Sequence, residues 1–215
     1  MNRQLINLII AFSFVGVASQ SCSQAYSGES SQENNETHRQ STSTFIAERK
    51  IELENQKRKA KQFLANHKNY SQEIIFLLDM RHPSQNHRFF VLDLSKDIIA
   101  EKGLVAHGSG SVIGDSLVFS NIPESYQSSL GRYRIGTKYT GNFGKSYKLH
   151  GLDKTNNNAF KRYIVLHPYS CVPDEEQDFP ICESLGCAMV SNNFMKTLYS
   201  IIDTSSKPIL MVMYY

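Results

Sequence analysis

Short apolar runs of strand length, separated by turn-forming residues, fill the chain from about residue 70 to its end. The first run is Glu73–Met80, the turn-prone segment 82–86 follows it, and Arg88–Leu94 and Ile98–Ala106 come next. Apolar runs of roughly four to eight residues that are bounded by Pro, Asn and Ser indicate strands joined by tight turns. These three runs therefore predict a meander that opens a β-sheet.

The rest of this region continues the pattern and adds a helix. Asn193–Ile202 spaces its apolar residues at helical intervals, which predicts an amphipathic helix. We expect residues 70–215 to form one mainly β domain with one or two helices, an α+β fold. Further strands are expected at Ser116–Ser120, Tyr133–Ile135, Tyr147–Leu149, Tyr163–His167 and Ile209–Tyr214.

The N-terminus has the pattern of an export signal. Arg3 precedes an uncharged apolar run from Leu5 to Val17, which is shorter than the ~20 residues that a membrane-spanning helix needs. A polar stretch follows at once, which disfavours a buried helix or a membrane anchor. We interpret residues 1–21 as a signal peptide that directs the chain to the periplasm or cell envelope. Cleavage after Ser19, or before Cys22 with lipid attachment to that cysteine, are both open.

Two further segments precede the β-rich region. Residues 22–44 are almost all Ser, Gln, Asn, Glu and Thr, and such a composition buries too little apolar surface to offset its ordering entropy, so a polar tether is expected. Residues 45–69 are highly charged and contain no Pro or Gly, which predicts a charged helix that lies on the domain with a solvated outer face. A basic helix that binds a partner is the alternative.

The charge balance and the glycine-rich segment exclude some functions. A net charge of +3 is too small to indicate nucleic-acid binding, and it suits an anionic polymer or a membrane surface equally. Ala106–Ser111 resembles part of a phosphate loop, but no Lys follows it, so nucleotide binding is not favoured. Its glycines are expected to allow a tight turn where a strand ends. His107 is either a structural hydrogen-bonding residue there or a substrate contact.

The cysteines allow two arrangements. If Cys22 carries lipid and Cys187 is free, Cys171 and Cys182 remain as a pair, and in an oxidising envelope they would close a surface loop as a disulfide. The alternative is a metal site that His167 shares with these two cysteines and Cys187. Because no Cys-x-x-Cys or Cys-x-x-His spacing occurs, no metal is expected.

A histidine and a cysteine near the C-terminus are the strongest candidates for chemistry. His167 ends the apolar run that begins at Tyr163, and Cys187 follows in Ser184-Leu185-Gly186-Cys187. An imidazole can take the proton of a thiol, and a Gly before the thiol lets a carbonyl approach backbone N–H donors. By themselves these residues indicate an acyl-transfer cysteine about as strongly as a buried structural one.

Six segments in a fixed order add a family resemblance over roughly residues 73–215. They are Phe89–Leu94, Gly103–Gly108, Ser128–Gly131, Gly151–Asp153 with Asn156, Val165–His167 and Ser184–Cys187. Together they resemble the L,D-transpeptidase catalytic-domain family of bacterial cell-wall enzymes, above all its murein-transpeptidase-like branch, which carries Ser-x-Gly-Cys at the nucleophile.

This resemblance implies a sandwich-like or barrel-like β-rich fold and a two-step acyl transfer on peptidoglycan stem peptides, with no cofactor. Cys187 would attack the carbonyl of an L,D peptide bond, and His167 would accept the thiol proton. Backbone N–H groups of Gly186 and Cys187 would hold the oxyanion, and Ser184 would have a supporting role. The candidate substrate-binding residues are His107, Ser129 and Tyr169.

The chain also departs from the better-known family members. They have His before the motif Gly and Arg or Asn soon after the Cys, where this chain has Leu185 and Ala188–Val190. They also have Gly after the base histidine, where this chain has Pro168. Two other functions therefore stay open. One is an L,D-carboxypeptidase that uses water as the acceptor, and the other is a non-catalytic peptidoglycan-binding module in which Cys187 is inert.

Overall fold

The computed structural model describes residues 30–114 and 116–215, with side chains from residue 44 onward. The predicted signal peptide and Cys22 lie outside these residues. The chain divides into two compact units, residues 1–45 and residues 46–215. Among the described helices, none is long and apolar enough to cross a membrane.

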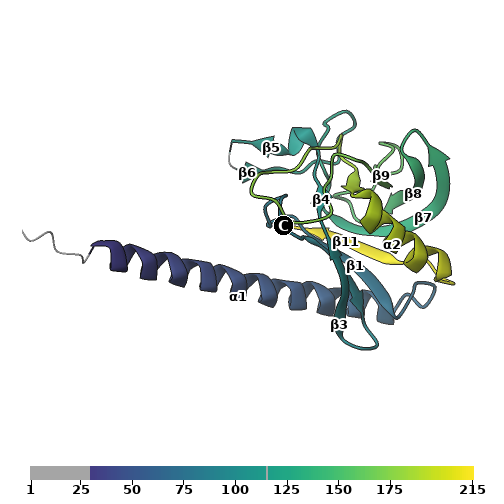
Figure 1. The fold of residues 1–215 in the computed structure, drawn as a ribbon. Helices are drawn as coiled ribbons and strands as arrows, with labels where there is room; N and C mark the ends of the chain where they lie inside the picture. The colour runs from purple at the N-terminus through teal and green to yellow at the C-terminus, as the bar shows by residue number, and fades with distance from the viewer. Residues whose placement is uncertain (1–29, 115) are drawn as a thin grey trace, which may run out of the picture. The chain divides into compact units, whose positions relative to one another are not determined.

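The helix α1 runs from Ser30 to Ala65 and begins earlier than the sequence predicts (Figure 1). The structure gives the segment from Ser30 to Thr44 as helix, where the sequence predicts a polar tether. The physical reason is that no Gly or Pro occurs between Gly28 and the end of the helix. Once the helix has nucleated among the strong helix formers after Thr44, no residue between Ser30 and Thr44 interrupts its propagation.

The C-terminal part of α1 packs into the domain's core. Ala60 and Leu64 are buried against Ile75, Leu77 and Leu210 of the sheet. A fully buried Leu side chain contributes about 1.5–3 kcal/mol relative to an exposed one. This half of the helix therefore stabilises the sheet instead of merely lying on it.

In the described part of the chain, one mixed sheet of nine strands forms the body of the domain, in the order β3-β2-β1-β11-β7-β8-β9-β10-β4. The C-terminal strand β11 is central, parallel to β1 and antiparallel to β7. The larger strands are β1 (Ile74–Asp79), β2 (Phe89–Asp93), β3 (Ile98–Gly103), β7 (Gly131–Gly141), β8 (Gly144–Gly151) and β11 (Leu210–Tyr214).

The remaining strands are short, with two to four residues each. Beside the sheet lie a one-turn helix and a two-stranded ribbon, whose second strand is shorter than the predicted Ser116–Ser120. The elements are β4 (Val105–Ala106), η1 (Ser109–Ser111), β5 (Val112–Ile113), β6 (Ser116–Leu117), β9 (Val165–Pro168), β10 (Ala188–Val190) and the helix α2 (Asn192–Thr204).

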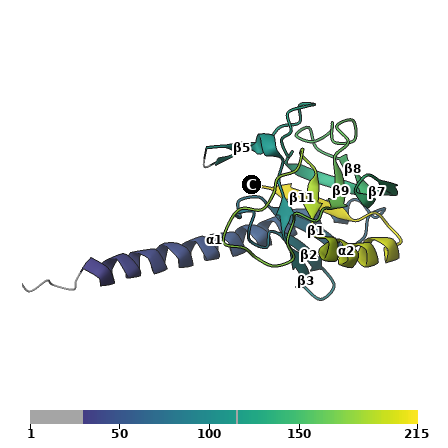
Figure 2. The same ribbon diagram turned by 45° about the horizontal axis from the view of Figure 1, so that its top comes forward.

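Two helices cover opposite faces of the central strands (Figure 2). In β1, Phe76 and Leu78 belong to the core cluster that contains α2, whereas Ile75 and Leu77 belong to the cluster that contains α1. Because both faces are buried, the strand needs apolar residues at every position, which explains its continuous apolar run. The fold is mainly β with two helices in the described chain, so the predicted α+β class is confirmed.

The sheet curls because its two edge strands are consecutive in the sequence. The predicted strand Ile98–Ala106 is in fact two strands, β3 and β4, that lie at opposite edges of the sheet order and are separated only by Leu104. Strand β3 ends at Gly103, where α2 packs so closely that a Cβ would lie 2.4 Å from the ring of Phe194. The chain therefore passes directly from the opening meander to the edge that carries β10.

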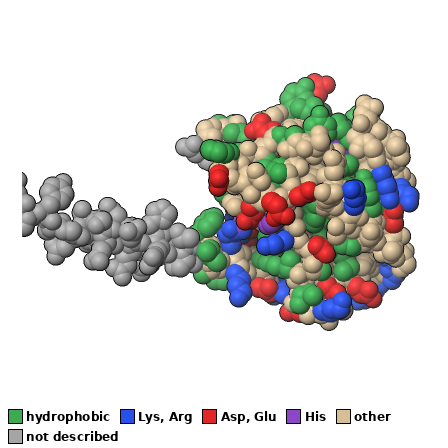
Figure 3. Space-filling view, viewed as in Figure 1, with side chains coloured by type: hydrophobic (Ala, Val, Ile, Leu, Met, Phe, Trp, Pro, Cys, Tyr) green, Lys and Arg blue, Asp and Glu red, His purple; other side chains and the backbone are tan. Residues whose placement is uncertain are grey.

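Charged side chains are mixed over the face that Figure 3 shows, with acidic and basic groups interspersed above β3 and around α2. A mixed surface of this kind is ordinary for a soluble domain.

Candidate active site

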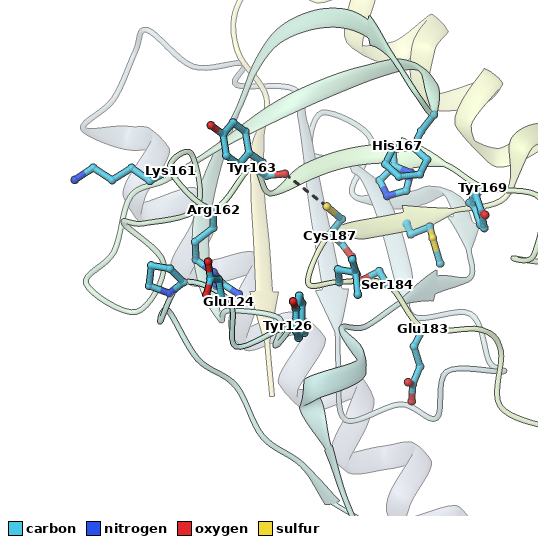
Figure 4. Close-up of a pocket in the computed structure, with 14 residues that line it drawn as sticks. Glu124, Tyr126, Lys161, Arg162, Tyr163, His167, Tyr169, Glu183, Ser184 and Cys187 are labelled. Carbon is cyan, nitrogen blue, oxygen red and sulfur yellow. Dashed lines mark hydrogen bonds between the residues drawn. The ribbon is translucent and has the colours of Figure 1, made fainter.

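Strands β9 and β10 bring His167 and Cys187 to one cavity. Their parallel register places Ala188 opposite Leu166 and Met189 opposite His167. Since Cys187 directly precedes β10, its position in this register is opposite Val165, which shares a face with His167 because side chains alternate along a strand. Both side chains line a cavity of about 570 Å³ (Figure 4).

The Cys187 thiol is neutral at rest. It is the free cysteine of the described chain, and its Sγ lies 3.7 Å from the carbonyl oxygen of Tyr163, which accepts its hydrogen. Burial raises the pKa of this thiol above its usual value, while the backbone N–H of Val165 and the charge of Arg162 oppose that rise. A thiol of this kind needs a base to become nucleophilic.

His167 has the tautomer that such a base needs. Its Nδ1 lies 3.0 Å from the carbonyl oxygen of Pro168, and because a carbonyl only accepts, Nδ1 must carry the hydrogen. The lone pair of Nε2 is therefore free to accept a proton. Burial lowers the pKa of His167, so the ring is neutral at neutral pH. The exchange of Gly for Pro after the histidine costs nothing here, since proline keeps its carbonyl.

Ser184 shapes the loop that leads to the nucleophile. Its Oγ accepts the N–H of Gly186 at 3.1 Å and donates to the carbonyl oxygen of Cys187 at 2.8 Å. Gly186 has φ +110°, a conformation that side chains other than glycine rarely adopt. In this structure the Gly186 N–H, which the sequence predicts would hold an oxyanion, is bonded to Ser184.

The glycine-rich segment 106–111 supports the same loop by close packing. A Cβ on Gly108 would lie 2.1 Å from the carbonyl oxygen of Tyr126 and 2.9 Å from Cα of Gly186. Gly108 itself is extended, with φ −72° and ψ 143°, and the tight turn expected after the strand is η1, in which the N–H of Ser111 donates to the carbonyl oxygen of Gly108 at 2.8 Å. The backbone N–H of Ser109 donates to the carbonyl of Ser184 at 2.8 Å, which ties the segment to the motif.

The three candidate substrate-binding residues occupy different places. Tyr169 lines the cavity and meets the ring of Phe143 edge-on at 5.8 Å. Ser129 is buried, with its Oγ 2.7 Å from the hydroxyl of Tyr133. His107 lines a separate cavity of about 430 Å³, where burial and the neighbouring Arg88 lower its pKa to about 4. Of the three, the structure brings only Tyr169 into the cavity of Cys187.

Several cavity residues were not identified from the sequence. Tyr163 begins the apolar run that ends in His167, and Lys161 and Arg162 directly precede it. This closeness to His167 in the sequence was the signal available for these three residues. Three cavity residues, Glu124, Tyr126 and Tyr163, have positive φ angles of 59°, 53° and 58°. Strained backbone of this kind clusters at functional sites. The cavity residues that the sequence did not indicate are Pro123, Glu124, Tyr126, Phe143, Lys161, Arg162, Tyr163, Glu183, Leu185 and Met189.

A disulfide joins Cys171 to Cys182, with their Cα atoms 6.0 Å apart. It closes the loop between β9 and the nucleophile motif and ends next to Glu183, which lines the cavity. Two groups of the alternative metal site are consumed by this bond. Among the described residues, no cluster of three or more His, Cys, Asp or Glu side chains has an arrangement that holds a metal ion.

Comparisons with known proteins give one family match and a similar solved structure. A family model described as the L,D-transpeptidase catalytic domain matches residues 47–214. Among solved structures, an L,D-transpeptidase from Xylanimonas cellulosilytica is similar, with 14% sequence identity and a TM-score of 0.37. That match covers 66% of this chain and 60% of the other. The search of curated proteins gives no match.

Proposed function

This chain belongs to the L,D-transpeptidase catalytic-domain family, and we propose that it is a cysteine acyltransferase of peptidoglycan stem peptides in the bacterial cell envelope. The observation that carries the proposal is that the neutral thiol of Cys187 lines the same cavity as a neutral His167, whose Nδ1–H is fixed on Pro168. The predicted signal peptide, 1–21, supports the envelope location, and a lipid on Cys22 would hold the protein at a membrane.

The first step forms a thioester. The Sγ of Cys187 attacks the carbonyl carbon of an L,D peptide bond while Nε2 of His167 takes the thiol proton. The oxyanion of the tetrahedral intermediate accepts the backbone N–H of Cys187. When the C–N bond breaks, His167 returns the proton to the departing amine. The terminal D-residue leaves, and the acyl group stays on sulfur.

The second step resolves the thioester. An acceptor amine attacks the same carbonyl carbon, and His167 takes one of its protons. The C–S bond then breaks and His167 returns that proton to the sulfur of Cys187, so the enzyme is regenerated. Aromatic side chains around the thiol, among them Tyr126, Phe143 and Tyr169, offer flat apolar walls with polar edges for a peptide.

Product identity tests this function directly. The purified protein is incubated with a stem tetrapeptide and an amine acceptor, and the products are weighed by mass spectrometry. A cross-linked product, formed with loss of the terminal D-residue, is expected. A trimmed tripeptide in the presence of amine would instead indicate the carboxypeptidase. Recovery of unchanged tetrapeptide would contradict the enzyme and favour the binding module.

The pH profile tests the state of the base. Only neutral His167 accepts the thiol proton, and burial lowers its pKa. Activity is therefore present above that lowered pKa and is lost as the pH falls through it. We expect the acid limb of kcat/KM, which reports the free enzyme, to lie below the ordinary imidazole value of about 6.5. Circular dichroism over the same range controls for acid unfolding, and an acid limb at or above the ordinary value would contradict the assignment.

A further inference from the structure

Arg162 joins two walls of the Cys187 cavity. Its Nη1 donates to the carbonyl oxygen of Ser120 at 2.8 Å, and its Nη2 donates to the carbonyl oxygen of Gln127 at 2.6 Å and to Oγ of Ser125 at 3.3 Å. A planar guanidinium satisfies these three acceptors together in a way that a single ammonium does not. One side chain thus holds the segment 120–127 against the segment that contains Tyr163.

The segment that Arg162 holds is strained. It contains Glu124 and Tyr126, both with positive φ, and such conformations persist only when the surrounding structure fixes them. The same segment touches the nucleophile loop, because the carbonyl oxygen of Gln127 would lie 2.9 Å from a Cβ on Gly186. Arg162 is therefore placed to fix the backbone immediately before Cys187.

The guanidinium also lies beside that loop as an uncompensated charge. Its Nη2 would lie 3.4 Å from a Cβ on Gly186. Within residues 44–114 and 116–215, no carboxylate forms an ion pair with it; the described ion pairs involve other cations. After Cys187 the next basic residue in the sequence is Lys196. A thiolate or an oxyanion at position 187 would thus be an anionic neighbour of Arg162.

We propose that Arg162 is a positioning residue of this site, which holds the segment 120–127 against Gly186 and stabilises negative charge at Cys187. This proposal rests on the proposed function for its catalytic consequence, whereas the effect on the thiol stands apart from any substrate. The other titratable groups around the thiol are His167 on β9, Tyr133 and Tyr139 on β7, and the cavity residues Glu124, Tyr126, Lys161, Tyr163, Tyr169 and Glu183.

Three variants separate the effect of the Arg162 charge from the effect of its hydrogen bonds to the segment 120–127. Arg162→Gln removes the charge and keeps an amide donor, whereas Arg162→Lys keeps the charge and loses the planar fork. Arg58→Gln makes the same change of charge on α1, outside the cavity of Cys187. The first measurement is the pH dependence of Cys187 alkylation by iodoacetamide, which reports the thiol pKa without a substrate. The second is kcat on the tetrapeptide.

We expect Arg162→Gln to slow alkylation at neutral pH by about tenfold, one unit of thiol pKa, because the stabilising charge is gone. Arg162→Lys should stay within about threefold of the wild type in alkylation and lose about tenfold in kcat through the released segment. The Arg58→Gln profile should match the wild type. An unchanged alkylation profile in Arg162→Gln would overturn the electrostatic role, as would an equal shift in Arg58→Gln.

The Lys variant tests the positioning role by itself if the Gln variant does not fold, and an unchanged kcat in that variant would overturn it. The two proposals fail in different ways. A wild type that never turns over the tetrapeptide contradicts the proposed function and leaves the alkylation result standing. A wild type that turns over, with both Arg162 variants unaltered in alkylation and kcat, contradicts the role of Arg162 alone.

Discussion

Replacing Cys187 with Ala is expected to abolish turnover of stem peptides, by at least about a thousandfold, because no other group can form the thioester. The fold should survive. The sulfur makes a single weak hydrogen bond, at 3.7 Å to the carbonyl of Tyr163, and the change from Cys to Ala removes one atom. Thermal unfolding should therefore change little, and turnover by mass spectrometry should be lost.

A carbapenem gives a second readout of the same residue. It should add covalently to the wild type and leave Cys187→Ala unmodified, as measured by intact mass. The matched control is the double variant Cys171→Ala/Cys182→Ala, which also lacks cysteines but keeps the nucleophile. That variant should lose about 2–4 kcal/mol of stability with its disulfide and still form the adduct. Turnover by Cys187→Ala at the wild-type rate would show that the nucleophile lies elsewhere.

Replacing His167 with Gln is expected to lower kcat by about 10²–10⁴-fold, the usual contribution of a general base. The amide of Gln can donate to the carbonyl of Pro168 as Nδ1 does, but it cannot accept the thiol proton. His150→Gln is the matched control, since its ring stacks on Phe160 and not in the cavity. It should keep the wild-type rate.

The His167 variant should also separate reactivity from turnover. Above the raised pKa of Cys187 the thiolate forms without a base, so alkylation at high pH should persist in His167→Gln while peptide turnover stays low. If His167→Gln turns over the peptide at the wild-type rate at neutral pH, another group serves as the base.

The strands and the family are what the sequence made predictable. The continuous apolar run of β1 survives because both of its faces are buried, and the run that ends in His167 corresponds to β9. The ordered segments, including Ser184–Cys187, carried the family assignment that the match over residues 47–214 confirms. These features are local patterns, in which the types and spacing of the residues indicate secondary structure and burial.

Element boundaries followed the tertiary structure instead. The run Ile98–Ala106 is apolar enough for one strand, yet it is divided at Leu104 between the two edges of the sheet. At the division, the ring of Phe194 from α2 packs closely over Gly103. A contact between residues so distant in the chain leaves no periodic signal in either segment.

For Cys187 and His167, the sequence by itself determined the residue types and their local pattern: a thiol after a glycine and an imidazole at the end of an apolar run. Only the tertiary structure decided their setting. It left His107 and Ser129 out of the lining of the Cys187 cavity, bonded the Gly186 N–H to Ser184, and brought Arg162 beside the loop that contains Gly186. The reason is physical. Reactivity resides in side-chain type, whereas burial, proton position and the field at the thiol are set by groups that only folding brings together.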